Sequence, residues 1–223
     1  MTTELEAKLA ELEALKAQVE KLENDIQAAQ LGPSWRATGY YGAYYATAGF
    51  VLGGVAALVS LLVNVLAAPL AGKSPLELVR VYLTFPLGEK ALQLTQGQNA
   101  YAVNDRVILA FGCCLYVATG MLVGIPIAMA LGRFAAKGGV ARRLVVASIV
   151  SLAVWAIMFY GILSWLQPLL VEGDPGNWIT NPAYLPWWVA AATHLVFGWT
   201  VALLYPLAEY HPYRRLLEPA PQP

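Results

Sequence analysis

The chain has 223 residues, of which 58% are hydrophobic and 13% charged, and its mean hydropathy of +0.55 is too high for an ordinary soluble domain. Its formal net charge is zero and its basic residues do not alternate with aromatic ones, so we expect no nucleic-acid partner. Cys113 and Cys114 are adjacent within an apolar run, which is typical of packing residues rather than of a disulfide framework. The composition predicts an integral membrane protein, which we expect to be all-α.

The first segment, 1–31, carries a heptad pattern that predicts a cytoplasmic, coiled-coil-like amphipathic helix. Charged residues fill the face opposite the apolar stripe, and Lys8 is the one discordant residue within it. A helix this short gains most of its stability from a packed apolar face, so the stripe needs a partner. The partner-packing residues of the stripe are Leu5, Leu12, Leu15, Val19, Leu22 and Ile26.

Three partners would cover this stripe: the same helix of another copy, a helix of a different subunit, or the membrane surface. The polar face mixes Glu and Lys, whereas anionic lipid favours Lys and Arg, so the surface is the least favoured of the three. We expect a different subunit.

Four long apolar runs follow an aromatic linker at 32–45, whose tyrosines and tryptophan are typical of a membrane interface. About 20 apolar residues in a helix cross the hydrocarbon core of a bilayer, so each run predicts one span. A proline-rich tail at 208–223 should be extended. Within a transmembrane domain at 46–207, the predicted spans are 46–70, 107–131, 144–166 and 185–207.

Small residues recur at three- and four-residue steps along the first two spans, where they allow a neighbouring backbone to approach closely. We expect these stripes to pack against partners, as the stripe of the first helix does. The residues concerned are Gly49 and Gly53 in the first span, and Gly112, Gly120, Gly124 and Ala128 in the second.

The connection at 71–106 is too long to lack secondary structure. Ser74, Pro75 and Glu77 form a helix-start signal, and apolar residues then share one face, which predicts a short helix lying flat on the membrane. Pro86 to Gly88 should end it before a second short piece at 89–94.

Basic residues predict the orientation of the four spans. One side would hold seven of them outside the first helix, and the other side would hold four. The positive-inside rule therefore places both termini in the cytoplasm. The seven are Arg36, Arg133, Lys137, Arg142, Arg143, Arg214 and Arg215; the four are Lys73, Arg80, Lys90 and Arg106.

His194 is the most readily ionisable side chain within any long apolar run. At 1.5 Å per residue, it would share a layer roughly 9 to 14 Å below the non-cytoplasmic end with Asn64, Tyr116 and Tyr160. A neutral imidazole bonded to Asn64 or to a tyrosine hydroxyl would satisfy its polar groups within this intramembrane polar layer.

More specific functions for His194, in binding a cofactor or a metal, stay open as alternatives. It could bind haem or quinone, with Tyr116 as a second contact, but any such cofactor would be shared with a partner subunit. His211 lies 17 residues away, about 25 Å along a continuous helix, so the two histidines cannot ligate one haem iron within a chain. A metal site of Cys113, Cys114 and His194 lacks supporting spacing, and we expect no resident metal or cofactor beyond lipids.

The fourth span, with THLVFGW flanked by PWW and LLYP, resembles accessory membrane subunits associated with bacterial haem-copper respiratory oxidases. The resemblance covers about a tenth of the chain and includes no ligand motif; it implies a respiratory setting. Hydrolytic and phosphoryl-transfer motifs are missing from the sequence, so we expect no catalysis by this chain alone. Together with this resemblance, the sequence predicts a non-catalytic accessory subunit of a larger bacterial inner-membrane complex, and the rival prediction is a homo-oligomeric channel or small-solute carrier.

Overall fold

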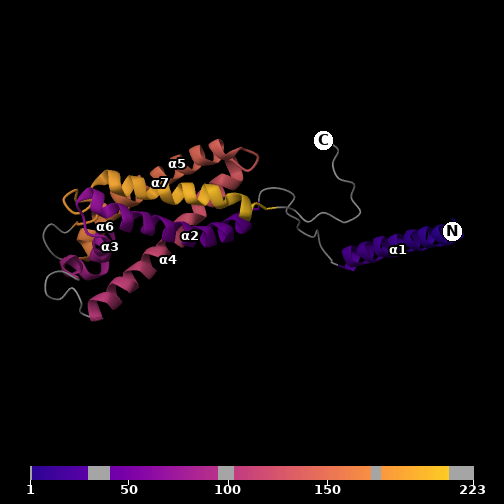
Figure 1. Cartoon of the computed structure of the whole chain (residues 1–223), viewed down its shortest axis with the longest axis horizontal. Helices are drawn as coiled ribbons and strands as arrows, with labels where there is room; N and C mark the ends of the chain where they lie inside the picture. The colour runs from indigo at the N-terminus through magenta and orange to yellow at the C-terminus, as the bar shows by residue number, and fades with distance from the viewer. Residues whose placement is uncertain (1, 30–40, 95–102, 172–176, 211–223) are drawn as a thin grey trace. The chain divides into compact units, whose positions relative to one another are not determined.

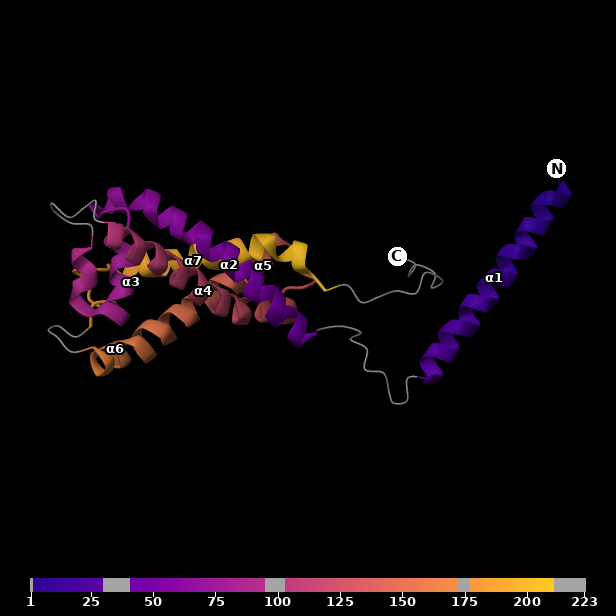
Figure 2. The same cartoon turned by 90° about the horizontal axis from the view of Figure 1, so that it is seen from below.

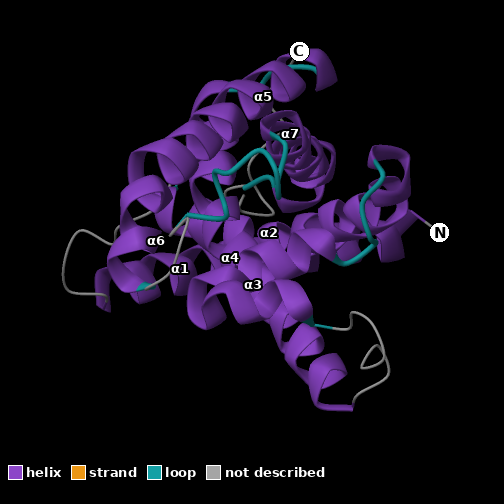
Figure 3. Cartoon of the chain, turned by 90° about the vertical axis from the view of Figure 1, so that its left-hand side faces the viewer, coloured by secondary structure: helices purple, strands orange, loops and turns teal. Residues whose placement is uncertain are grey.

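Helices form every regular element of the residues described by the computed structural model, which are 2–29, 41–94, 103–171 and 177–210 (Figure 3). Backbone contacts divide the chain into two units, Met1–Thr38 and Gly39–Pro223. The boundary falls within the aromatic linker predicted at 32–45, of which residues 32–40 lie outside the described ranges. Residues 211–223 of the predicted tail, His211 included, also lie outside them.

The first unit contains α1 (Thr2–Ala29), a continuous helix of 28 residues, as the heptad pattern predicted (Figure 1). Its described stripe residues are solvent-accessible, with exposed fractions between 46% at Val19 and 60% at Leu22. The side chains of Leu5 and Ile26 lie outside the described part. Pairing of α1 into a coiled coil stays a prediction.

The second unit contains four helical segments that are long and apolar enough to cross a membrane, which confirms the predicted number of spans (Figure 2). Each observed segment agrees with its predicted range to within a few residues. The four segments are Gly42–Leu70, Asn104–Phe134, Val140–Leu170 and Trp187–Ala208. Their main helices are α2 (Gly42–Ala67), α4 (Val103–Phe134), α5 (Val140–Ala156) and α7 (Trp187–Leu204), and the 3₁₀ turns η1 (Ala68–Ala71) and η5 (Tyr205–Ala208) continue α2 and α7.

The predicted two-part connection between the first two spans is present as α3 (Glu77–Leu87) and the 3₁₀ helix η2 (Gly88–Gln93), at one end of the four helices (Figure 1). Gly88 ends α3 with a φ of +62°, a conformation that glycine adopts without steric cost. The helix is buried on two sides, because Val79 and Leu83 pack against Leu109 while Val81 packs against Ile179. It therefore belongs to the interior of the unit, and its flat position on a membrane stays a prediction.

The third span contains an irregularity that hydropathy did not predict. After α5 the chain forms a π-helical segment, η4 (Ile157–Leu163), before returning to an α-helix in α6 (Ser164–Leu170). π segments inside α-helices are rare and occur frequently at functional sites. This one lies beside the cavity described below.

Tyrosines join the start of α2 to the end of α7. The rings of Tyr45 and Tyr205 stack with centroids 5.9 Å apart, and the Tyr205 hydroxyl donates to the Tyr45 hydroxyl at 3.2 Å. Arg143 lies over the Tyr205 ring at 5.3 Å and pairs with Glu209 at 3.9 Å. These contacts fix the three helices at the end that we predicted to face the cytoplasm.

Candidate functional site

The predicted small-residue stripes face each other within this chain, along the line where α2 packs on α4. A Cβ built on Gly49 would lie 2.6 Å from the Gly124 carbonyl oxygen and 2.7 Å from the Ala128 Cβ. Gly53 meets Gly120 and Gly124 in the same way. The stripes thus pack against each other within the unit itself.

Gly112 has a different neighbour from the other small residues of α4. A Cβ added there would lie 2.7 Å from Leu83 Cδ1 and 2.9 Å from Val79 Cγ1, both of α3. The absence of a side chain at Gly112 lets α3 settle against the second span. Gly112 therefore positions the connection that closes one end of the cavity.

A polar network crosses the unit from α4 through α2 to α7. The Tyr116 hydroxyl lies 2.9 Å from Ser60 Oγ, and Asn64 Nδ2 donates to the Ser60 carbonyl at 2.8 Å. Thr193 Oγ1 lies 3.0 Å from Asn64 Oδ1 and 2.8 Å from the Val189 carbonyl oxygen. Asn64 therefore acts as a helix-to-helix hydrogen-bonding residue, which is the common use of such a residue in a span.

His194 bonds within its own helix rather than to Asn64 or a tyrosine. Its Nδ1 lies 2.8 Å from the Ala190 carbonyl oxygen, one turn earlier in α7, and its ring meets Phe159 edge-on with centroids 5.5 Å apart. The preceding helical turn offers a carbonyl within reach, so the imidazole needs no partner from another span for this nitrogen.

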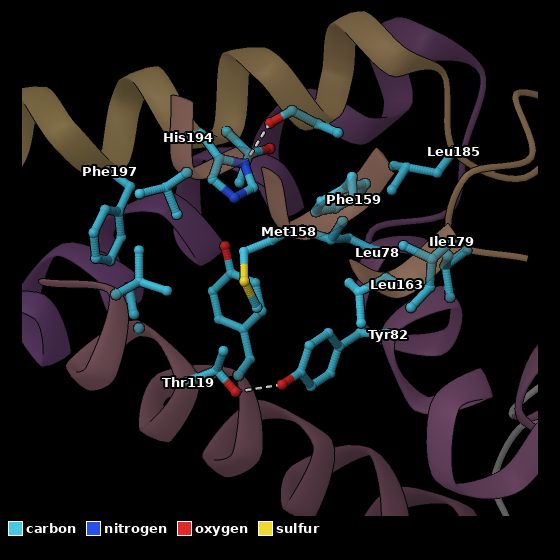
Figure 4. Close-up of a pocket in the computed structure, with 18 residues that line it drawn as sticks. Leu78, Tyr82, Thr119, Met158, Phe159, Leu163, Ile179, Leu185, His194 and Phe197 are labelled. Carbon is cyan, nitrogen blue, oxygen red and sulfur yellow. Dashed lines mark hydrogen bonds between the residues drawn. The ribbon is translucent and has the colours of Figure 1, made fainter. Parts of the chain in front are cut away.

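His194 faces a cavity of about 120 Å³ that is lined mainly by residues of α3, α4, η4 and α7 (Figure 4). Tyr116 lines the same cavity, so the structure brings together the two residues predicted as cofactor contacts. Most of the wall is apolar, and its polar contributors are Tyr82, Tyr116, Thr119, Thr193 and His194. The apolar wall includes Leu78, Val81, Val123, Val154, Met158, Phe159, Leu163, Ile179, Leu185 and Phe197. Such a mostly apolar pocket with a few convergent polar groups is the usual form of a small-molecule site.

Other candidate residues lie away from this cavity. Tyr160 is half exposed, and its ring meets that of Trp155 at 5.6 Å. Cys113 packs beside the α3 cluster and Cys114 is exposed. Within the described ranges, no three His, Cys, Asp or Glu side chains are grouped as a metal site would require.

Several cavity and network residues were not singled out from the sequence. Ser60 lies one helical turn before Asn64, and Thr193 directly precedes His194, so helical spacing around the two predicted polar residues could have found them. Tyr82 lies in the short helix predicted after Ser74, whose apolar residues share one face, and Thr119 had no distinguishing feature beyond its polarity. No local sequence pattern predicts that α3 packs near α7, where Val81 and Ala190 belong to one buried cluster.

No protein-family model, curated protein or solved structure matches this chain.

Proposed function

We propose that this chain is a non-catalytic accessory subunit of a larger bacterial inner-membrane complex, of the respiratory electron-transfer or terminal-oxidase class. One observation carries the proposal: α1 is a complete helix whose apolar stripe is exposed, with Leu12 at 47% and Leu15 at 52%. The respiratory setting is supported only by the resemblance of the fourth span. Both termini would lie in the cytoplasm.

The stripe of α1 is long enough for a specific partner. At 1.5 Å per residue, a helix of this length extends about 42 Å. The rest of its surface carries Lys and Glu side chains, such as Lys16, Glu20 and Lys21, which favour water over hydrocarbon. An aqueous helix with one apolar face is typical of pairing with another helix, and that helix would belong to a partner subunit.

The membrane unit offers a second contact surface. Large apolar side chains are exposed on every span, among them Leu58 at 57%, Phe111 at 63%, Ile149 at 64% and Leu203 at 59%. Lipid chains or the spans of other subunits would cover them, since both are equally apolar. The small-residue faces are not available for this purpose, because α2 and α4 already use them on each other.

Mass spectrometry of the complex extracted from membranes in mild detergent tests the proposal. We expect the chain to appear in one mass with other membrane polypeptides. A monomer free of partners would contradict it. A homo-oligomer that makes vesicles permeable to small solutes would favour the channel or carrier instead.

A further inference from the structure

The described polar side chains that line the cavity have already used their hydrogen-bond donors. A carbonyl oxygen can only accept, so His194 Nδ1 must carry the hydrogen that lies between it and the Ala190 carbonyl. A neutral imidazole then has an unprotonated Nε2, which accepts. No described residue bonds to Nε2, and Figure 4 shows the His194 ring turned into the cavity.

The imidazole is neutral for a structural reason. The described residues that line the cavity include no carboxylate, and a charge without a counter-ion is costly at this depth in a membrane. His194 Nε2 therefore offers the cavity a lone pair.

The two phenols of the wall have also used their hydrogens. The Thr119 hydroxyl donates to the Leu115 carbonyl at 3.0 Å, so the Tyr82 hydroxyl donates to Thr119. The Ser60 hydroxyl donates to the Ala57 carbonyl at 3.1 Å, so the Tyr116 hydroxyl donates to Ser60. Both phenol oxygens keep lone pairs, and the cavity presents acceptors within apolar walls.

We propose that this cavity binds an uncharged six-membered ring that carries a hydroxyl group, a phenol or the headgroup of a hydroquinone, whose hydroxyl donates to His194 Nε2. The volume of about 120 Å³ suits a single ring, since an apolar cavity of about 150 Å³ admits benzene. Phe159 and Phe197 supply aromatic rings to the wall. An oxidised quinone, whose carbonyl oxygens only accept, finds no free donor among the described residues that line the cavity. The inference is independent of the accessory role, because binding requires this chain alone.

The test measures binding to the purified full-length chain in lipid nanodiscs by ¹⁹F NMR, with 4-fluorophenol and 4-fluorotoluene as probes and empty nanodiscs as the background. We expect saturable binding of 4-fluorophenol. His194→Leu should weaken it about tenfold and leave the affinity for 4-fluorotoluene unchanged, because only the phenol loses a hydrogen bond. Equal affinity of the two probes for the native chain, or an unchanged affinity for 4-fluorophenol in His194→Leu, would overturn the proposal.

Two further variants separate the cavity from a general effect on folding. Val123→Phe places a ring in the cavity and should abolish binding of both probes. Thr200→Val, on α7 outside the cavity, removes a hydroxyl that donates to the Val196 carbonyl of its own helix, and it should change the binding of neither probe. Retained binding of both probes in Val123→Phe would place them elsewhere and overturn the assignment. Displacement of 4-fluorophenol by hydroquinone would assign the quinol class, and its failure, with the His194 dependence retained, would assign a simple phenol.

Discussion

Gly53 of α2 and Gly124 of α4 lie so close that a Cβ built on Gly53 would be 2.9 Å from the Gly124 Cα. The obstacle is backbone, which cannot move aside as a flexible side chain can. We expect Gly53→Ala to lower the free energy of unfolding by about 1 to 3 kcal/mol, the usual cost of forcing an extra methyl into a packed interface. Thermal unfolding in detergent, followed by circular dichroism, measures it.

Gly161→Ala is the matched control for this substitution. A Cβ there would meet only Ile157 Cγ2, at 3.9 Å, which is ordinary van der Waals contact. We expect the melting temperature of this variant to equal or exceed that of the native chain, since alanine also favours a helix. Equal losses in both variants would mean that close packing at Gly53 does not stabilise the unit.

The sequence predicted the features that depend on average hydropathy, on a repeated pattern or on a local signal. The four spans follow from long apolar runs, and α1 follows from its heptads. The end of α3 follows from Pro86 and Gly88, which act locally. Pairing of glycine stripes with each other, rather than with another subunit, could not be predicted, because a stripe shows that a backbone can approach and not whose backbone it is.

The residues around the cavity show a second limit. The hydropathy of a segment does not distinguish an α-helix from a π-helix. The apolar run IMFYGIL therefore did not predict η4. The polarity of His194 predicted that it needs a hydrogen-bond partner, and the partners expected were on other spans, whereas its bond to the Ala190 carbonyl is local. Tyr116 and His194 were grouped by depth alone, and both line the same cavity; Tyr160, at a similar depth, is exposed elsewhere.

Gln167 should be a strong determinant of stability. It is fully buried in α6; its Nε2 donates to Thr84 Oγ1 at 2.9 Å, and its Oε1 accepts from the backbone N–H groups of Trp178 at 3.0 Å and Ile179 at 3.2 Å. Gln167→Leu leaves the buried N–H groups of Trp178 and Ile179 without an acceptor. Each unsatisfied donor should lower the free energy of unfolding by about 1 to 3 kcal/mol. We expect faster hydrogen exchange at the amides of Trp178 and Ile179.

Gln93→Leu serves as the control, because Gln93 is exposed at the end of η2. It should leave exchange at those two amides unchanged. If Gln167→Leu also left them protected, Gln167 would not be what holds the segment after α6 in place.

The stripe of α1 should be required for assembly but not for folding of the membrane unit. The double variant Leu15→Gln, Leu22→Gln removes two exposed leucines and keeps residues that favour a helix. We expect other subunits to be lost when the tagged chain is purified, while the thermal unfolding of the membrane unit stays unchanged. Quantitative mass spectrometry of the purified material measures the loss.

Ala10→Gln, Ala17→Gln is the matched double variant. Both alanines are exposed and lie on the face of the heptad opposite the stripe. Assembly should survive these changes. Loss of subunits in both double variants would indicate that α1 acts through its charged face or its overall helicity rather than through leucine packing.

The predicted orientation can be tested with single cysteines on either side of α4. In a chain with Cys113→Ala and Cys114→Ala, Glu89→Cys and Lys137→Cys introduce thiols at exposed positions before and after this span. Because Lys137 belongs to the more basic side, a membrane-impermeant maleimide should label Glu89→Cys in intact spheroplasts and Lys137→Cys only after permeabilisation. The reverse pattern would place both termini outside the cytoplasm. Labelling of both thiols from one side would contradict the crossing of the membrane by α4, because a single span separates them.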